Sequence, residues 1–455
     1  MSITVDTSNI KNNPHCPHGP TVLFSRSDNQ RFYVCSACRN RKDCSFFVNE
    51  NELGKISEYN KKIWEKEKQK YIGNINHIKL YILFNKVKGQ KESDRVYCIG
   101  CNEFELPHFK EKHMKHVLKC NISDYLLSRP SQFLEPLENP KKEAQYMFSK
   151  VAVETIIDVL QERSVRNILC IGAPRIHEYI LNEKPNMNSL LLDIDKRYHN
   201  FYSPLQFCWF NSFNNYFFLP DSFNVFKDFI QTEKGDNFIL ITDPPFGGRV
   251  ELLSQTFKEI NTLYQKLNKR SNDLDMMWIF PYFMEPQILN SLPNFKMLDY
   301  KVDYDNHPLF QAGAKGRKHG SPVRIFTNIN PCDIKLPSDQ GYKYCSKCKR
   351  WVSSENVHCN KCQACTSKDG RTYIHCDVCV RCVKPTWKHC DACNRCTQVD
   401  HKCGELAFEQ ACFHCKQKGH KKRDCPKVNH EELQKKRKKI LHTNVIKKKK
   451  IKSEH

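Results

Sequence analysis

The sequence lacks the features that would place it in or beyond a membrane. Its first residues, MSITVDTSNIKNN, are polar and contain no apolar signal core. No segment approaches the roughly 20 apolar residues that a bilayer-spanning helix needs. The most apolar stretch, residues 276–284, is short and interrupted by Pro281. We therefore expect no membrane partner and a reducing compartment.

Acidic residues are also few relative to basic ones. The chain has 50 aspartates and glutamates and 73 lysines and arginines, which gives a net charge of +23. This excess favours a polyanionic partner, of which nucleic acid is the commonest; a solvated basic surface is the alternative. We expect the lysine-rich tail, residues 428–455, to be disordered. The tail can serve nuclear import, RNA binding or solubility alone.

Cysteine, in contrast, is abundant. In a reducing compartment we expect the 25 thiols to bind metal rather than to form disulfides. They cluster at 16–44, 98–120 and 345–425, and few lie between about 140 and 330. This cysteine-poor segment is rich in Phe, Leu and Ile and is the only part of the chain able to form a large core.

Short apolar runs and helical patterns alternate within residues 140–330. The runs that predict buried strands are 167–172, 189–195, 237–243, 276–280 and 322–327. Helical patterns occupy 144–163 and 251–267, and a charged helix is expected at 55–70. Buried strands that alternate with helices predict an α/β fold with a doubly wound, Rossmann-like sheet.

Three strand ends carry residues suited to a ligand, which in such sheets binds beyond the carboxyl ends of the strands. Gly172 opens the turn IGAPR, where the missing Cβ would let a cofactor approach the backbone closely. About 20 residues later, Asp193 or Asp195 can accept both hydroxyls of a ribose. The third strand ends in the tetrad Asp243-Pro244-Pro245-Phe246.

The tetrad suits methyl transfer to an exocyclic adenine amine, a poor nucleophile whose lone pair is delocalised into the ring. The Asp243 carboxylate and the Pro244 carbonyl can accept hydrogen bonds from the N–H groups as the nitrogen pyramidalises. Pro244 and Pro245 stiffen the loop, and Phe246 can stack on an extruded base. The alternative is a Pro-Pro turn in which the aspartate only caps a helix. The position of the tetrad at a third strand end favours catalysis.

The first cysteine cluster, residues 14–52, resembles a GRF zinc finger. Three cysteines and one histidine can close a tetrahedral zinc site: Cys16, His18, Cys35 and Cys44. Cys38 is a spare thiol that leaves this ligand set open. GRF fingers typically bind single-stranded nucleic acid. Arg31, Phe32 and Tyr33 can offer charge and stacking to it, although Phe32 can equally be part of a small core.

The second cluster, residues 95–120, has the pattern of a two-Cys two-His finger. The ligands that it predicts are Cys98, Cys101, His113 and His116. The two histidines are closer together than the usual spacing, so Cys120 can replace one of them.

Residues 343–405 hold sixteen potential ligands. They are Cys345, Cys348, His358, Cys359, Cys362, Cys365, His375, Cys376, Cys379, Cys382, His389, Cys390, Cys393, Cys396, His401 and Cys403. So few large apolar residues cannot drive folding, and metal binding must supply the folding energy. The spacing does not show how zinc ions share the ligands. The segment resembles a DHHC-type cysteine-rich domain, but the second histidine is missing after His401, which argues against palmitoyl transfer and favours a structural platform.

Residues 410–427 have the spacing of a CCHC zinc knuckle. Its ligands are Cys412, Cys415, His420 and Cys425. Such knuckles bind single-stranded bases, and Phe413 is suited to stack on one.

Residues 166–330 resemble the amino-methyltransferases that carry the [DN]PP[FYW] signature. A narrower resemblance covers residues 14–426. It is carried by the order of the zinc modules and by LEPLENPKKEAQYMF, LLLDIDKRYHNFY, TDPPFGG, WIFPYF, MLDYKVDYDNH and SPVRIFTN. These segments are similar to the family of CCHC zinc-knuckle adenine-N6 methyltransferases of large-subunit ribosomal RNA.

The resemblance implies S-adenosylmethionine-dependent methylation of N6 of one adenosine in large-subunit rRNA by a class I methyltransferase domain. It implies a role for zinc in folding the RNA-binding modules and not in the chemistry. The cofactor residues that it implies are Gly172, Ala173, Pro174, Arg175, Asp193, Asn211 and Asp243.

The family also implies a nucleolar and nuclear location, and we expect the cytoplasm as a further one. RNA helicases and ribosome-assembly factors are the expected protein partners. One alternative function is a non-catalytic, zinc-dependent RNA-binding scaffold in ribosome biogenesis. A second is the same chemistry on DNA or on a protein glutamine.

Overall fold

The computed structural model describes residues 3–38, 40–106, 113, 115–137, 145–232, 237–307, 320–401 and 403. The chain divides into two compact units. The larger comprises Val5–Ser25 and Gln30–Pro385, and the smaller comprises Met1–Thr4, Arg26–Asn29 and Thr386–His455. The zinc knuckle and the basic tail predicted from residue 410 onward lie outside the described residues.

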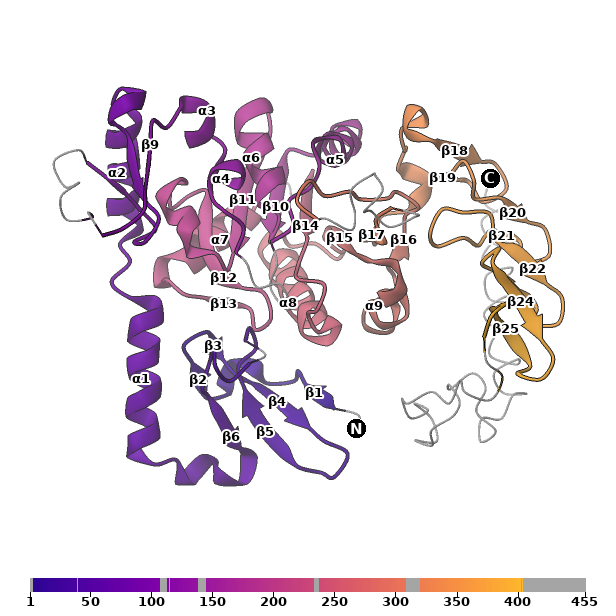
Figure 1. Cartoon of the computed structure of the whole chain (residues 1–455), viewed down its shortest axis with the longest axis horizontal. Helices are drawn as coiled ribbons and strands as arrows, with labels where there is room; N and C mark the ends of the chain where they lie inside the picture. Colours follow the sequence, from indigo (N-terminus) through magenta and orange to yellow (C-terminus); the bar gives the residue numbers. More distant parts are fainter. Residues whose placement is uncertain are drawn as a thin grey trace. The chain divides into compact units, whose positions relative to one another are not determined.

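An eight-stranded mixed sheet is the centre of the larger unit (Figure 1). Its strands are β10 (Asn167–Ile171), β11 (Asn188–Asp193), β12 (Phe207–Asn211), β13 (Tyr216–Phe217), β14 (Phe238–Thr242), β15 (Asp275–Pro281), β16 (Lys296–Met297) and β17 (Val323–Thr327). The spatial order is β13-β12-β11-β10-β14-β15-β17-β16. The five neighbouring strands β12, β11, β10, β14 and β15 run parallel to one another, whereas β17 runs antiparallel to both β15 and β16.

The order of the strands reverses at β10. The chain builds outward from β10 through β11 to β12 and then returns to the other side of β10 with β14. The carboxyl ends of β10 and β14 lie side by side, because Ile171 is the register partner of Thr242. Ligands of doubly wound sheets bind at such a switch point.

Helices cover both faces of the sheet. They are α5 (Lys150–Glu162), α6 (Pro174–Glu183), α7 (Pro220–Ile230), α8 (Val250–Asn268) and α9 (Glu285–Ser291). Alternate strand residues enter two separate cores: Ile168 and Cys170 pack with α5 and α6, and Leu169 and Ile171 pack with α7 and α8. A strand that is buried on both faces is continuously apolar, as the sequence showed for β10.

The predicted α/β fold and its five strands are confirmed, as are the helix at 251–267, which is α8, and the charged helix, which is α1. Three strands were not predicted: the inner strand β12 and the two-residue edge strands β13 and β16. The helix predicted at 144–163 starts too early, since α5 begins at Lys150. The Ser149 side chain accepts a hydrogen bond from Ala152 N and ends the preceding extended segment, in which Phe148 bridges to Tyr304.

The N-terminal part of the larger unit contains small antiparallel pairs and two helices. Its elements are β1 (Thr4–Asp6), η1 (Ile10–Asn12), β2 (His15–Cys16), β3 (Gly19–Pro20), β4 (Val22–Ser25), β5 (Arg31–Val34), β6 (Phe47–Asn49), η2 (Glu50–Lys55), α1 (Glu58–Ile72) and α2 (His77–Lys88). Figure 1 shows α1 as a long helix between the N-terminal finger and α2. No residue of α1 is buried, which fits its charged sequence.

The remaining elements are short. They are η3 (Glu92–Asp94), β7 (Val96–Cys98), β8 (Glu103–Glu105), β9 (Leu118–Cys120), α3 (Asp124–Leu127), α4 (Pro130–Phe133), η5 (Lys196–Asn200), η6 (Tyr282–Met284), η7 (Pro331–Asp333), η8 (Ser338–Gln340), β18 (Tyr342–Cys345), β19 (Arg350–Ser353), β20 (His358–Cys359), β21 (Ala364–Cys365), β22 (Ile374–Cys376), β23 (Arg381–Val383), β24 (Trp387–Cys390) and β25 (Arg395–Gln398). Consecutive strands from β18 to β25 pair as two-stranded ribbons.

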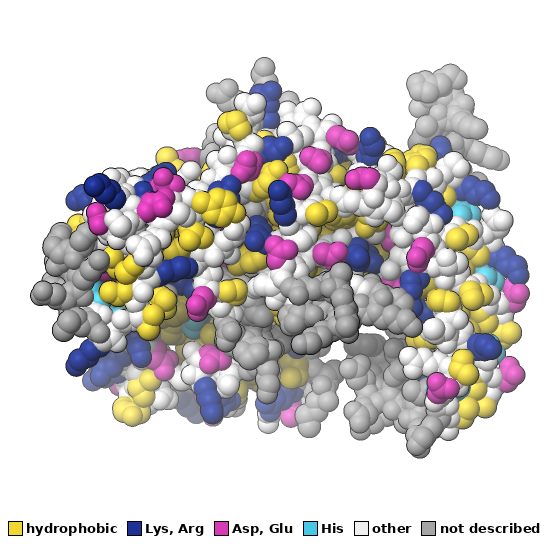
Figure 2. All heavy atoms as spheres, turned by 45° about the horizontal axis from the view of Figure 1, so that its top comes forward, with side chains coloured by type: hydrophobic (Ala, Val, Ile, Leu, Met, Phe, Trp, Pro, Cys, Tyr) yellow, Lys and Arg dark blue, Asp and Glu magenta, His cyan; other side chains and the backbone are white. Residues whose placement is uncertain are grey.

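Two surface properties bear on the expected partners. Within the described part of the chain, no helix is both long and apolar enough for a membrane span. On the face in Figure 2, Lys and Arg side chains are interspersed with Asp and Glu. The described residues of this face therefore do not form a patch of one sign.

Replacing Ser149 by Ala should loosen the first turn of α5, because the cap hydrogen bond to Ala152 N is lost at a cost of about 1 kcal/mol. Hydrogen exchange of residues 150–153 should become faster. Ser57→Ala is the matched control, since Ser57 caps α1 in the same way; it should loosen α1 alone. Unchanged exchange at α5 in the Ser149 variant would show that the cap does not set this boundary.

Candidate active site and metal centres

A cavity of about 450 Å³ opens at the switch point of the sheet. Its walls come from the ends of β10, β11, β12 and β14, from residues 145–147, and from the N-terminal finger. A cavity of this size suits a nucleoside-containing ligand. Of the predicted site residues, the structure places on its walls Gly172, Pro174, Asp193, Asn211, Asp243, Pro244, Pro245 and Phe246.

Gly172 sits where a side chain would collide with the neighbouring strand end. Its φ is +63°, and a Cβ at this position would lie 3.1 Å from the Asp243 carbonyl oxygen. Its N–H donates to Leu192 O at 3.0 Å, which ties the turn to β11. Glycine therefore lets the backbone turn next to Asp243 and leaves space that a ligand can use.

Two residues of the same turn face elsewhere. Ala173 is buried and Arg175 lies on α6, and neither lines the cavity. The Arg175 guanidinium donates to Phe148 O and to the Asp305 carboxylate, both at 2.5 Å. Arg175 thus joins α6 to residues 148 and 305, and the cofactor contact that the family resemblance implies for it stays a prediction.

The two aspartates that follow β11 have different partners. The Asp195 carboxylate is held by the Arg197 guanidinium at 2.7 Å and by the Gln145 amide at 3.0 Å. Asp193 faces the cavity, and burial, together with the nearby charge of Asp195, raises its pKa to about 7. A buried carboxylate that faces a cavity is suited to accept ribose hydroxyls, so the geometry favours Asp193.

Asp243 accepts a hydrogen bond from the Tyr304 hydroxyl at 3.0 Å. Burial raises the pKa of Asp243 well above its ordinary value, and the Tyr304 hydrogen bond partly offsets this rise. Tyr304 is buried and stacks on Phe148, with ring centroids 5.2 Å apart. Tyr304 lies in the segment MLDYKVDYDNH that carried the family resemblance, but no sequence motif singles it out as a hydrogen-bond partner of Asp243.

Phe246, the last residue of the tetrad, belongs to a group of packed aromatic rings. Its ring stacks on Tyr146 with centroids 5.9 Å apart, and it meets Phe280 and Tyr304 edge-on. Phe246 and Tyr146 both line the cavity and are only partly buried. Together they offer apolar ring surface beside Asp243 on which a flat base can stack.

Asn211 lines the cavity, but its side chain is used within the protein. Its Nδ2 donates to His18 O at 2.9 Å and to Ser36 Oγ at 3.0 Å, and its Oδ1 accepts from Phe213 N at 3.1 Å. The amide therefore joins the end of β12 to the N-terminal finger.

The residues present fit an S-adenosylmethionine molecule by three observations. The cavity has the volume, Gly172 leaves a cradle that a Cβ would fill, and Asp193 supplies a buried carboxylate. Asp243 lies beside this cradle, since its backbone carbonyl is the atom nearest to the missing Cβ. A methyl donor held here would be next to the acid of the tetrad.

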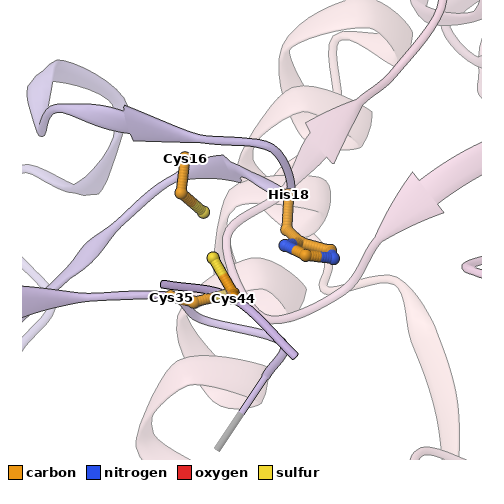
Figure 3. A group of neighbouring side chains, drawn as sticks. All are labelled: Cys16, His18, Cys35 and Cys44. Atoms are coloured by element: carbon orange, nitrogen blue, oxygen red, sulfur yellow. The ribbon is translucent and has the colours of Figure 1, made fainter. Parts of the chain in front are cut away.

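The N-terminal finger brings together the four predicted ligands Cys16, His18, Cys35 and Cys44. Their ligand atoms all lie within 4.8 Å of one another, and all four residues are buried. Figure 3 shows the sulfur atoms of Cys16 and Cys44 pointing into the space between them. This donor set fits a closed, structural zinc site. Cys38 lies beside it, with its sulfur 3.5 Å from His18 Nε2.

The second finger brings together Cys98, Cys101, His113 and His116, again with ligand atoms within 4.8 Å. Glu105 approaches the far nitrogen of His113 at 3.0 Å and can orient that ring, as carboxylates do behind metal-bound histidines. Cys120 is exposed on β9 and is not part of this group.

In the cysteine-rich segment, successive metal sites interleave. One group contains Cys345, Cys348, His358 and Cys365, and the next contains Cys359, Cys362, His375 and Cys382. The His and the last Cys of a His-Cys-x2-Cys-x2-Cys repeat thus join the preceding group, while the two middle cysteines join the following one. The spacing alone had left this sharing open.

The other ligands predicted in this segment lie in both units. Cys376 and Cys379 are in the larger unit, and His389 and Cys396 are in the smaller. Within the smaller unit, Cys390 Sγ lies 3.5 Å from Cys403 Sγ, and Cys393 Sγ lies 3.4 Å from His401 Nε2. The ligands predicted for the zinc knuckle lie outside the described residues: Cys412, Cys415, His420 and Cys425.

Comparison with protein families identifies two segments. Residues 139–328 match the family described as probable N6-adenine methyltransferase. Residues 410–427 match the zinc knuckle family. The first match contains the sheet, the tetrad and the strand ends that line the cavity. The second coincides with the four ligands whose structure is not described.

Three curated relatives carry the name rRNA N(6)-adenosine-methyltransferase ZCCHC4. The human protein is 43% identical over 430 residues, which cover 91% of this chain and 83% of the human protein. The mouse protein is 47% identical over 431 residues, with the same coverage. The Xenopus laevis protein is 47% identical over 428 residues, covering 91% of this chain and 86% of the relative.

Gly172→Ala should weaken cofactor binding by about tenfold, since the added methyl crowds Asp243 O and the positive φ is strained. Isothermal titration with S-adenosylhomocysteine measures this. Gly341→Ala is the control, because Gly341 also has a positive φ, of +83°, but a Cβ there would come no closer than 3.9 Å to another residue, and Gly341 does not line the cavity. Equal affinities of the two variants would contradict the assignment of Gly172.

Cys348→Ser should lower the zinc content of the purified chain, because a group of four loses one donor. Metal analysis by mass spectrometry gives the zinc-to-protein ratio. Cys332→Ser is the control, since Cys332 is exposed and belongs to none of the metal groups named above. A full zinc complement in the Cys348 variant would disprove this ligand set.

Proposed function

Because this chain belongs to the family of rRNA N(6)-adenosine-methyltransferases, we propose that the tetrad at Asp243 methylates N6 of one adenosine in large-subunit ribosomal RNA. The observation that carries the proposal is the position of Asp243 beside the Gly172 cradle at the switch point. This position sets an acceptor for amine protons next to a cavity that fits a methyl donor.

S-adenosylmethionine supplies an electrophilic methyl group when it is bound. The Asp243 carboxylate and the Pro244 carbonyl accept hydrogen bonds from the adenine amine and direct its lone pair toward that methyl. Tyr304 fixes the carboxylate by its hydrogen bond of 3.0 Å. As positive charge develops on the nitrogen, the negative charge of the partly buried Asp243 stabilises it.

The aromatic group holds the base. Phe246 and Tyr146 present ring surface beside the tetrad, and a base taken out of its stack can lie against it. The stiff Pro244-Pro245 backbone fixes the direction of the Pro244 carbonyl. Orientation by these groups supplies a large part of the rate enhancement, because the amine itself is only weakly nucleophilic.

The zinc groups act by folding the RNA-binding modules. In both fingers and in the two complete groups of the larger unit, four protein ligands surround each site, which leaves no open position for a substrate. The knuckle at 410–427 and the lysine-rich tail add single-stranded RNA contacts and positive charge. We place the protein in the nucleolus and nucleus, and also in the cytoplasm, with RNA helicases or ribosome-assembly factors as partners.

A non-catalytic RNA-binding scaffold is the main alternative. It requires a methyltransferase domain that has lost its site, whereas here Asp243, Tyr304 and the Gly172 cradle are assembled. Binding of the methyl donor by the wild-type chain separates the two functions.

The direct test incubates the chain with tritiated S-adenosylmethionine and total RNA, fractionates the RNA and maps the label. We expect label at adenosine N6 in large-subunit rRNA. Asp243→Ala should reduce it by about a hundredfold or more, the usual cost of losing one such group. Label in another RNA class would overturn the substrate, and undiminished label with Asp243→Ala would overturn the site.

The pH profile tests the state of Asp243. Ionised Asp243 is the active form, and burial raises its pKa, so activity should fall with decreasing pH well above the usual range for an aspartate. Tyr304→Phe removes a hydrogen bond that lowers this pKa, and the acid limb should move to higher pH. Rates measured across pH with saturating cofactor check both shifts. An acid limb that stays in place or moves down in the Tyr304 variant would contradict the assignment.

A further inference from the structure

The N-terminal finger contributes to the wall of the cofactor cavity. The cavity that contains Gly172 and Asp193 is also lined by four finger residues: His18, Ala37, Cys38 and Asp43. These four finger residues, α1 and the sheet belong to the same compact unit. Removing the finger would therefore open one side of the cavity to solvent.

Two asparagines, one at the end of β12 and one just after it, donate hydrogen bonds to the same backbone carbonyl of the finger. Asn214 is buried, and its Nδ2 donates to His18 O at 3.0 Å and to Pro20 O at 2.8 Å. Asn211 Nδ2 donates to His18 O at 2.9 Å. The carbonyl of a predicted zinc-ligand residue is thus fixed to the strand end that forms the cavity.

The approach of the finger to the sheet is close. Gly19 has a φ of +93°, and a Cβ there would lie 2.5 Å from the Tyr216 ring. On the other side of the turn, the His18 ring packs on Tyr71 with centroids 4.2 Å apart. Tyr71 itself lines the cavity and packs on Trp209 of β12. The turn at His18 is therefore enclosed by groups of the methyltransferase domain and of α1.

We propose that the zinc-folded finger, residues Cys16–Cys44, is a cofactor-binding element whose attachment to Asn211 and Asn214 sets the affinity for the methyl donor. The zinc ligands shape the turn at His18, and the turn completes the cavity wall. A finger that serves RNA alone would not need to line this cavity. This inference rests on the proposed function, because it requires the cavity to hold S-adenosylmethionine.

The attachment also couples cofactor binding thermodynamically to the position of the N-terminal finger. If attachment of the finger to the sheet strengthens cofactor binding by some free energy, bound cofactor must stabilise the attached finger by the same free energy. Cofactor binding should therefore protect the finger backbone from local opening.

The test uses the full chain with Asn214→Ala, which removes two hydrogen bonds of the attachment and leaves every zinc ligand and cavity residue in place. Titration with S-adenosylhomocysteine should show a Kd raised by about tenfold. Zinc content should stay at the wild-type value. An unchanged Kd, or a change confined to the affinity for RNA, overturns the proposal.

Asn268→Ala is the matched control. Its Nδ2 also donates to two backbone carbonyls, Ile230 O and Tyr264 O, each at 2.9 Å. It lies at the end of α8 and does not line the cavity. The cofactor Kd of this variant should equal that of the wild type. If both variants weaken binding equally, general destabilisation explains the effect and the proposal fails.

Hydrogen exchange of the wild-type chain provides a second measurement that needs no variant. Saturating S-adenosylhomocysteine should slow exchange in residues 15–20 and 35–38, and should leave residues 96–105 of the second finger unchanged. Unaltered exchange in the first finger overturns the coupling. A wild-type chain that does not bind S-adenosylhomocysteine defeats the proposed function, whereas tight binding with no response of the finger defeats this inference alone.

Discussion

The contact between the ends of β10 and β14 is the constraint on which the site depends. Parallel pairing sets Ile171 beside Thr242, so the next residues, Gly172 and Asp243, must share a narrow space. A glycine with positive φ is the residue that turns there without displacing the Asp243 carbonyl. The cradle for a methyl donor and the acid that holds the amine thus arise from a single register.

Asp243 illustrates how burial and hydrogen bonding act in opposition at this site. Loss of solvent raises the pKa of its carboxyl group, and the Tyr304 hydroxyl opposes that rise. The tyrosine comes from the segment before β17, far from the tetrad in sequence. The same segment bridges to Phe148, next to the cavity-lining residues Tyr146 and Met147. Three separate parts of the chain therefore determine the state of one carboxylate.

Different parts of this chain are stabilised in different ways, by apolar burial in the sheet and by metal binding in the small zinc modules. The sheet has two apolar cores, one on each face, and is stabilised by burial. The ribbons from β18 to β25 have small, paired strands and rely on metal ligands in place of a core. The N-terminal finger combines both modes, since its ligands are buried and its turn at His18 is packed against the sheet.

The sequence by itself determined what depends on local pattern: the five buried strands, the charged helix, the α/β class, the acid tetrad and the zinc donors. Strand ends and cysteine spacings are short-range features, so one sequence suffices to recognise them. Tertiary structure decided which groups meet across long separations. It directed Asp193 to the cavity while Arg197 holds Asp195, brought Tyr304 to Asp243, interleaved the zinc ligands and set the finger against Asn214. These choices depend on packing between distant segments, which residue spacing does not encode.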